Sequence, residues 1–397
     1  MPKAVYSAIK SKAVLISLKT KLAVSLSASK STKNDIEIKS TDKSAVIKAR
    51  SDKNIVVLLL IKPLETVIYY IVAQNIIKSK VENKIFIKLS QKGDNMQEKE
   101  LDYKSLIEKL NELSSKYECV DFSYIGTTLL NRSIPLITLG EKTAEKGVLY
   151  VATHHASENI CSSVLLRFIN DYAYAYERYG QVSQINMRYL YKMRKIFIVP
   201  MLNPDGVEYR LNGLAPENPI KDRVIAYNGG NEDFTHWNSN ARGVDLNHNY
   251  DAFFEEYKEI EKEREIYAGK TKYSGEYAES EPEISSLCNF IRFNLDTIDG
   301  VLSLHTQGEE IYYSSRGEIP RKSIHIAKII SRLTGYELAQ ATDTASYGGL
   351  TDWLIIKHQK PSFTLECGRG ENPLPMRNLT DIYTRIKELL FTFPILF

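Results

Sequence analysis

The chain has 397 residues, of which 43% are hydrophobic and 25% are charged. This composition excludes a disordered or fibrous protein, and the length suffices for one large enzyme core with an appended segment. The formal net charge of +3 hides two unlike parts, because residues 1–95 carry about +11 and the remainder about −8.

Residues 1–95 form a basic N-terminal extension of uncertain structure. The extension has a single glycine, Gly93, and no tryptophan, whereas folded domains usually place glycine in their turns. The composition changes at Met96, where an amphipathic helical pattern begins. Translation from Met96 is therefore one hypothesis, and residues 96–397 are the predicted catalytic domain.

The extension is not expected to cross a membrane or to bind nucleic acid. Its two apolar runs, at 55–61 and 67–77, are each shorter than the about 20 residues that span a bilayer. Its positive charge can attract phosphate, but it lacks interleaved aromatic residues and a recognisable fold. We therefore expect neither a transmembrane segment nor a nucleic-acid partner.

The cysteines favour a reducing compartment. Four are present, widely spaced and without a CxxC pair, so a disulfide framework is not expected. A cytoplasmic protein is the simpler interpretation, and association with a spore or a cell wall stays open. Cys367, beside Glu366, is interpreted as a small wall residue in preference to a nucleophile.

From about residue 100, apolar runs typical of strands alternate with helical periodicity. Strands are predicted at 147–155, 195–203, 299–307 and 361–368. Helices are predicted at 158–179, 281–293, 322–334, 349–357 and 378–392. This pattern predicts an α/β fold, with a mixed and mostly parallel twisted sheet flanked by helices and with the chemistry at strand ends.

His155 and Glu158 lie three positions apart, where a predicted strand turns into a helix. Residues at this spacing can each reach to within about 2.0–2.2 Å of one zinc ion. A solvent-facing polar turn is the alternative, since the HxxE pattern often arises by chance. His154 offers a neighbouring imidazole, but alternation along a strand sends adjacent side chains to opposite faces, so at most one of the two histidines should bind the ion.

A third ligand must come from another segment. His305, near the end of a predicted buried strand, is the best candidate among the remaining histidines, and a buried structural histidine is the alternative. Two histidines and one glutamate leave a tetrahedral position for water, which is typical of a catalytic zinc. We therefore expect one Zn²⁺ per chain.

The segments HHASE, NPDG, NARGVDLNHNY, SLHTQG, YGGLTDW and SFTLECGRGENPLP follow one another in an order that resembles the zinc carboxypeptidase family. The resemblance covers roughly residues 100–397. Within the family, the residues of these segments are most similar to those of bacterial γ-D-glutamyl-meso-diaminopimelate peptidases, which act on cell-wall stem peptides. The resemblance implies a zinc metallopeptidase with His155, Glu158 and His305 as metal ligands.

The resemblance also implies roles for four further residues. Glu366 matches the family's general base and acid, which takes a proton from water and passes it to the leaving amine. Arg242 resembles the cation that stabilises the tetrahedral oxyanion. Asp245 is expected to hold a ligating histidine through its second ring nitrogen, and Asn247 matches the residue that binds a terminal carboxylate. Without the resemblance, Glu366 would be interpreted as a salt-bridge partner and Arg242 as a surface residue.

The chain departs from the family at the substrate contacts. Carboxypeptidases have an arginine where this chain has His248, so the bidentate grip on a free C-terminus should be weaker or differently built. The family's mobile tyrosine falls near Thr344, and whether Tyr347 takes its role is open. Thr351 at the specificity position predicts no side-chain class, and Arg369 suits either a substrate carboxylate or a structural ion pair.

The predicted function is hydrolysis of an amide bond in peptidoglycan stem peptides, with the γ-D-glutamyl-diaminopimelate bond favoured. An ordinary zinc carboxypeptidase, a zinc deacylase or amidase, and a non-catalytic muropeptide-binding protein are the alternatives. The presence of all three ligands together with Glu366 disfavours the last of these. The expected partner is a peptide or muropeptide, and the oligomeric state stays open.

Overall fold

The computed structural model describes residues 36–41, 44–51, 54–60, 99–341 and 344–397. The chain divides into two compact units between Ser90 and Gln91. Met96 lies outside the described residues, so a translation start there stays a prediction.

The N-terminal unit contains a three-stranded antiparallel sheet, although this region of the sequence has almost no glycine. The strands are β1 (Ile36–Thr41), β2 (Ser44–Ser51) and β3 (Asn54–Leu60), and β2 lies between the other two. The apolar run that the sequence shows at 55–61 lies in β3 as far as Leu60.

An eight-stranded sheet organises the second unit, in the order β12-β11-β13-β10-β6-β9-β5-β4. Its strands are β4 (Val120–Thr127), β5 (Ser133–Leu139), β6 (Gly147–Ala152), β9 (Lys195–Val199), β10 (Ile298–His305), β11 (Glu310–Tyr312), β12 (Glu337–Ala339) and β13 (Ser362–Glu366). Four of its seven pairings are parallel. The prediction of a mixed, mostly parallel sheet is confirmed.

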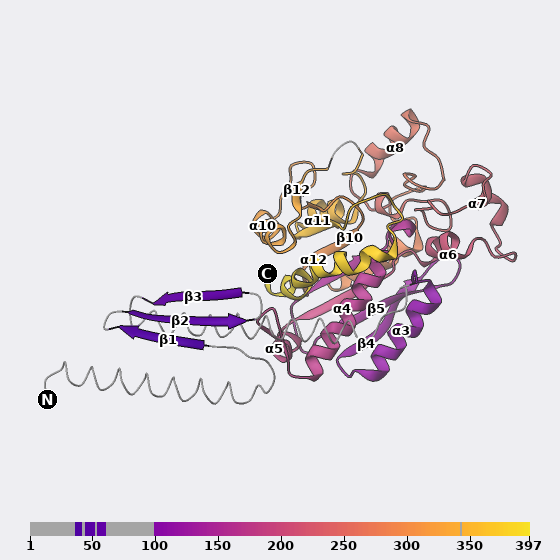
Figure 1. Ribbon diagram of the computed structural model, residues 1–397. Coiled ribbons are helices and arrows are strands. Elements are labelled where there is room, and N and C mark those ends of the chain that lie inside the picture. The colour runs from indigo at the N-terminus through magenta and orange to yellow at the C-terminus, as the bar shows by residue number, and fades with distance from the viewer. Residues whose placement is uncertain (1–35, 42–43, 52–53, 61–98, 342–343) are drawn as a thin grey trace. The chain divides into compact units, whose positions relative to one another are not determined.

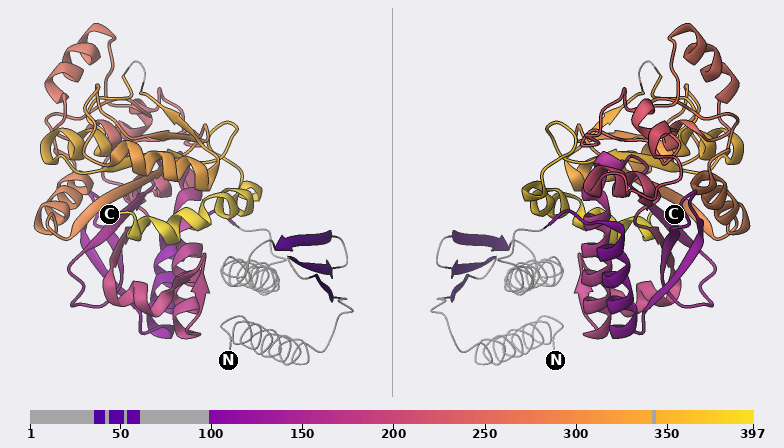
Figure 2. Two further views of the ribbon diagram at one scale, coloured as in Figure 1. Left: turned by 90° about the vertical axis from the view of Figure 1, so that its left-hand side faces the viewer. Right: turned by 90° about the vertical axis from the view of Figure 1, so that its right-hand side faces the viewer.

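Helices cover both faces of this sheet (Figures 1 and 2). The helices described are α3 (Tyr103–Lys116), α4 (Ile160–Glu177), α5 (Met187–Met193), α6 (Pro204–Asn212), α7 (Lys221–Tyr227), α8 (Phe254–Glu263), α9 (Pro282–Phe293), α10 (Ser323–Thr334), α11 (Leu350–His358) and α12 (Leu379–Thr392). The predicted helices agree with α4 and α9 to α12 within two residues at each end. Across the described ranges, no helix is long and apolar enough to cross a bilayer.

The central strand β6 is buried on both faces, which is why its sequence is a continuous apolar run. Val148, Tyr150 and Ala152 belong to the core that α4 and α12 cover. Leu149 and Val151 belong to the core that α9 and α11 cover. Since β9, β6, β10 and β13 run parallel, their carboxyl ends meet at one edge of the sheet.

Phe168 on α4 tests how much the first of these cores stabilises the fold. Its ring is fully buried and packs edge-on against Tyr150, Tyr172 and Phe391. We expect Phe168→Ala to lower the free energy of unfolding by about 3–5 kcal/mol, because it removes buried area and leaves a cavity. Urea denaturation measures this change.

The matched control is Phe293→Ala at the end of α9, where the ring is 90% exposed. This substitution should change the free energy of unfolding by no more than about 0.5 kcal/mol. Equal losses in the two variants would contradict the assignment of Phe168 to the core.

Candidate active site

Three side chains converge at the carboxyl edge of the sheet, from two neighbouring strands. His155 follows β6, Glu158 ends the short 3-10 helix Ala156–Glu158, and His305 ends β10. Glu158 Oε1 lies 2.9 Å from His155 Nδ1, and Glu158 Oε2 lies 3.0 Å from His305 Nδ1. One ligand atom from each residue lies within 4.8 Å of the others, so the group can hold one metal ion.

The chemistry of the donor set fits a cation. His155 Nε2 faces Asp245 Oδ1 at 3.0 Å, and an ionised carboxylate only accepts, so the proton of a neutral ring lies on Nε2. Nδ1 then presents a lone pair to Glu158. Glu158 Oε2 is buried and forms no regular hydrogen bond among the described residues, although His305 Nδ1 lies 3.0 Å away. A metal ion between these lone pairs satisfies all of them.

The carboxylates and imidazoles of this group also compensate one another's charge. Burial opposes ionisation of Glu158, but His155 and His305 outweigh it and lower the pKa of the carboxyl to about 2. Burial alone would lower the pKa of His155, yet Glu158 and Asp245 raise it well above its ordinary value. The site is therefore built to concentrate negative charge around one position.

Asp245 contacts the second ring nitrogen of His155, as the sequence analysis expects. Besides His155, its Oδ1 accepts from the backbone N–H of Asn247 at 3.2 Å, and its Oδ2 accepts from the N–H of Lys272 at 2.9 Å and the hydroxyl of Thr271 at 3.1 Å. These bonds fix the carboxylate and, through it, the orientation of the imidazole.

The neighbouring His154 points elsewhere. Its Nε2 lies 2.8 Å from the hydroxyl of Tyr250, and its ring stacks on His305 with centroids 5.2 Å apart. Burial lowers the pKa of His154 well below its ordinary value. Only His155 of the pair joins Glu158 and His305. Strand alternation is not the reason, because β6 ends at Ala152 and both histidines lie in the turn that follows it.

Glu366 stands beside the ligands at the end of β13. It pairs in register with His305 across the parallel β10–β13 ladder. Burial, followed by the nearby Glu158 carboxylate, raises the pKa of Glu366 well above its ordinary value. A carboxylate with raised basicity at this position suits proton transfer.

Cys367, the next residue, is fully buried and belongs to the core. Its backbone N–H donates to the carbonyl of His305 at 2.8 Å, and its side chain lies on the opposite face of β13 from Glu366. All four cysteines are free and buried. These contacts are those of a packing residue and not of a nucleophile.

Arg242 is held by Glu281 and not by the three candidate ligands. Its Nε donates to Glu281 Oε2 at 3.1 Å, and its Nη2 donates to Glu281 Oε1 and to the carbonyl of Ser280, each at 3.0 Å. The side chain is 40% exposed. Glu281 and the carbonyl of Ser280 therefore fix the orientation of the guanidinium, and its role toward a substrate stays a prediction.

Asn247 and His248 lie in the short 3-10 helix Leu246–His248. Asn247 Oδ1 accepts from the N–H of Leu350 at 3.2 Å, and no described residue accepts from its side-chain NH₂ group. His248 Nδ1 lies 2.7 Å from the carbonyl of Tyr347, and its ring stacks on Tyr257 with centroids 4.4 Å apart. One edge of the His248 ring is therefore occupied by the Tyr347 carbonyl and one face by the Tyr257 ring.

The two positions considered for the family's mobile tyrosine, Thr344 and Tyr347, differ in environment. Tyr347 is half-buried, with its ring 5.3 Å from the Arg316 guanidinium and 5.9 Å from the Tyr257 ring. Thr344 is 92% buried, being 8% exposed, and directly follows residues 342–343, which are outside the described part. The role of Tyr347 stays a prediction.

Thr351 and Arg369 have protein partners. The Thr351 hydroxyl lies 2.9 Å from that of Thr364 on β13, two residues before Glu366. Arg369 Nε lies 3.0 Å from Glu309 Oε2. This ion pair is the structural alternative that the sequence left open for Arg369.

Three asparagines that the sequence analysis assigned no role support the site. Asn203 Nδ2 donates to the carbonyls of His154, Asn238 and Ser239 at 3.0–3.2 Å. Asn238 Oδ1 accepts from the hydroxyl of Ser157, between two ligands. Asn372 Nδ2 donates to the carbonyl of Thr306 at 2.8 Å and lies 3.4 Å from Glu158 Oε1. Asn203 and Asn372 occur in the quoted segments NPDG and GENPLP, which was the available signal.

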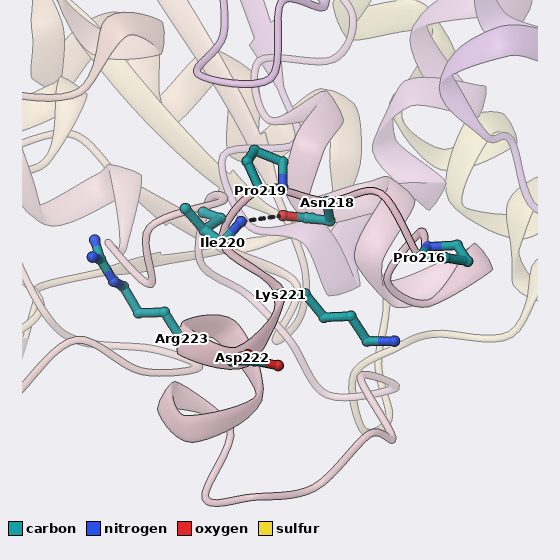
Figure 3. Close-up of a pocket in the computed structure, with 7 residues that line it drawn as sticks. All are labelled: Pro216, Asn218, Pro219, Ile220, Lys221, Asp222 and Arg223. Carbon is teal, nitrogen blue, oxygen red and sulfur yellow. Dashed lines mark hydrogen bonds between the residues drawn. The ribbon is translucent and has the colours of Figure 1, made fainter.

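A surface hollow of about 390 Å³ lies away from these residues, at the turn before α7 (Figure 3). It is lined by Pro216, Asn218, Pro219, Ile220, Lys221, Asp222 and Arg223. The Ile220 N–H donates to Asn218 Oδ1 at 3.0 Å, and the Lys221 N–H donates to the carbonyl of Asn218 at 3.2 Å. None of its lining residues is a buried titratable group, so we do not interpret this hollow as the active site.

The buried carboxyl behind Arg242 predicts a pH effect. Burial, Asp205 and Glu281 raise the pKa of Glu283 from 4.5 to about 8. The fold therefore binds a proton here that the unfolded chain releases near pH 4.5. This contribution to stability is complete below that pH and is lost as the pH rises through about 8.

We expect Glu283→Gln to be more stable than the wild type at pH 8 and to lose this advantage near pH 4.5. Urea denaturation at half-unit pH steps measures the difference. The exposed Glu118→Gln serves as control and should follow the wild type at every pH. Parallel curves for wild type and Glu283→Gln would contradict the assignment.

The comparisons with known proteins agree with this geometry. The zinc carboxypeptidase family model matches residues 104–385. The γ-D-glutamyl-L-diamino acid endopeptidase 1 of Lysinibacillus sphaericus is 33% identical over 283 residues, which cover 71% of this chain and 69% of the relative. Human carboxypeptidase B is 27% identical and is matched over 62% of this chain and 57% of its own length.

A solved structure shows the same fold. The carboxypeptidase A of Helicoverpa armigera superposes with a TM-score of 0.55 at 16% identity, over 90% of this chain and 95% of that chain. The family match covers most of the chain and includes all three residues of the metal group. The chain therefore belongs to the zinc carboxypeptidase family and is a zinc-dependent metallopeptidase.

Proposed function

We propose that this peptidase hydrolyses an amide bond in peptidoglycan stem peptides, between γ-D-glutamate and diaminopimelate. The observation that carries the proposal is the 33% identity to an endopeptidase whose name specifies a γ-D-glutamyl-L-diamino acid bond. The mammalian carboxypeptidase B relatives are less similar, at 26–27% identity. The family shows that the substrate is a peptide, and the particular bond in the wall peptide is what we propose in addition.

The contacts at the substrate terminus support the same choice. A carboxypeptidase grips a free C-terminus with two parallel hydrogen bonds from an arginine. His248 offers no such fork, and its Nδ1 is already bonded to the carbonyl of Tyr347. Asn247 supplies a single neutral amide donor. This arrangement suits a substrate that is not defined by its free terminal carboxylate.

His155, Glu158 and His305 would hold the zinc ion, which would supply Lewis acidity toward a carbonyl and a bound water. Glu366 accepts the proton of the attacking water and then donates it to the departing amine nitrogen. Arg242, oriented by Glu281, is the proposed donor to the oxyanion. No covalent acyl-enzyme is required.

Two alternatives are separated by substrate. An ordinary carboxypeptidase would cleave α-linked C-terminal residues, and a deacylase or amidase would cleave N-acyl amino acids. A non-catalytic muropeptide-binding role is disfavoured, because the three ligands and Glu366 are all present and adjacent. We propose that the reaction takes place in the cytoplasm, because four free and buried cysteines suit a reducing compartment, and association with a spore or a cell wall is the alternative.

Cleavage of L-Ala-γ-D-Glu-meso-diaminopimelate tests the proposal. The zinc-loaded wild type should release diaminopimelate, a chelator should stop the reaction, and added zinc should restore it. Glu366→Gln should lower kcat by about 10²–10⁴-fold, because the amide cannot accept the proton. Chromatography of the products measures both effects.

The exposed Glu371→Gln, five residues further along, is the matched control and should keep wild-type kcat. Absence of cleavage by the zinc-loaded wild type would refute the wall-peptide proposal. Cleavage of N-acyl amino acids instead would identify a deacylase.

Asp245→Asn tests the supporting carboxylate. Asparagine can still accept from His155 Nε2, but it removes the negative charge that increases the donor strength of Nδ1. We expect zinc affinity to fall about tenfold to a hundredfold, as measured by competition with a chromophoric chelator. Asp251→Asn, at an exposed carboxylate paired with Lys357, should leave zinc affinity unchanged. An unchanged affinity in Asp245→Asn would show that Asp245 does not tune the metal group.

A further inference from the structure

A row of three polar side chains crosses three adjoining strands at the site. His305 on β10 is in register with Glu366 on β13, and Glu366 is in register with Glu310 on the antiparallel strand β11. Neighbouring strands lie about 4.8 Å apart. Glu310 therefore stands one strand beyond the proposed base, on the side away from the metal group.

The face that carries this row is polar, whereas the opposite face is apolar. Leu304, Leu365 and Ile311 form the matching row on the other face and are fully buried in the core. On the site's face, Thr364 lies opposite Tyr312 in the next register pair. Both of these residues are half-buried. The wall beyond the proposed base is therefore built for a polar group.

The carboxylate of Glu310 has one neutral partner and no cationic one. Tyr312 donates its hydroxyl hydrogen to Glu310 Oε2 at 2.6 Å. Within the described ranges, no lysine, arginine or histidine forms an ion pair with Glu310. The adjacent Glu309, in contrast, lies 3.0 Å from Arg369 and 3.6 Å from Arg385. Glu310 is thus a half-buried carboxylate that has no positive partner in the described part of the chain.

The direction of the substrate follows from the proposed chemistry. The amine nitrogen that leaves must take its proton from Glu366, so the residue that carries this nitrogen lies on the Glu366 side of the metal group. Its side chain then runs along the β13–β11 wall, past Thr364 and toward Glu310. A cationic end on this side chain would supply the missing partner.

We propose that Glu310 binds the side-chain ammonium of the amino acid that leaves, so that the enzyme selects diamino acids in this position. This inference rests on the proposed function, since it takes Glu366 as the proton donor to the leaving amine. Tyr312 is a positioning residue, because its hydrogen bond to Oε2 holds the Glu310 carboxylate in place. Thr351, bonded to Thr364, closes the same wall with hydroxyl groups.

A substrate pair that differs only in this ammonium tests the proposal. The peptides are L-Ala-γ-D-Glu-L-Lys and L-Ala-γ-D-Glu-L-norleucine, assayed with zinc-loaded enzyme. The wild type should prefer the lysine peptide in kcat/KM by about tenfold to a hundredfold, the range expected for a hydrogen bond to a charged group. Glu310→Gln should lose this preference through the lysine peptide alone. Glutamine still accepts from the Tyr312 hydroxyl, so only the charge is removed.

Glu309→Gln is the matched control, since it removes the same charge one residue earlier. Its carboxylate is occupied by Arg369 and Arg385, so the ratio of the two kcat/KM values should stay that of the wild type. An equal loss on both peptides in Glu310→Gln, or a wild type without preference, would overturn the proposal.

A binding measurement separates this inference from the choice of scissile bond. L-Lysine and L-norleucine are titrated calorimetrically into the zinc-loaded wild type and into Glu310→Gln. Tighter binding of lysine in the wild type alone would support the role of Glu310, even if neither γ-linked peptide were cleaved and the proposed function therefore failed. Equal binding of the two amino acids by the wild type would overturn the inference, even if both peptides were cleaved.

Discussion

The site depends on one buried carboxylate. Glu158 is 4% exposed, and an ionised carboxylate removed from water destabilises the fold strongly unless positive charge or hydrogen bonds compensate it. The compensation available comes from two imidazoles and a cation held between them. His155 and His305 must therefore point at Glu158, and Asp245 must in turn hold His155 in that orientation.

Much of this was accessible from the sequence, for identifiable reasons. Strands buried on both faces produce unbroken apolar runs, so β6, β9, β10 and β13 were located, and the helices beside them show the 3.6-residue period. Polar residues at the ends of such runs stand out, so His155, Glu158 and His305 are candidate ligands from the residues themselves, whereas the role of Glu366 depends on the resemblance to the family. Their adjacency could only be expected, because it depends on the order of strands in the sheet.

Other features left no such signal. The strand β11 has only three residues, Glu310 to Tyr312, which is too short a segment to show a strand pattern, so Glu310 could not be placed beside Glu366. Arg242 and Glu281 are 39 positions apart, and an ion pair at that separation follows only from the folded path. Asn203 and Asn372 donate to backbone carbonyls, which carry no side-chain pattern.

The central strand β6 raises a question of register that its hydrophobic residues cannot answer. A strand with one polar face is fixed in register because a slip by one residue would expose its apolar side chains. Both faces of β6 are apolar, so a slip would exchange one core for the other at little cost in burial. The directional bonds just beyond the strand are what such a slip would break, notably those from Asn203 to the carbonyl of His154 and from His155 to Asp245. The polar groups that suit the site to hold zinc thus also determine how the centre of the sheet is aligned.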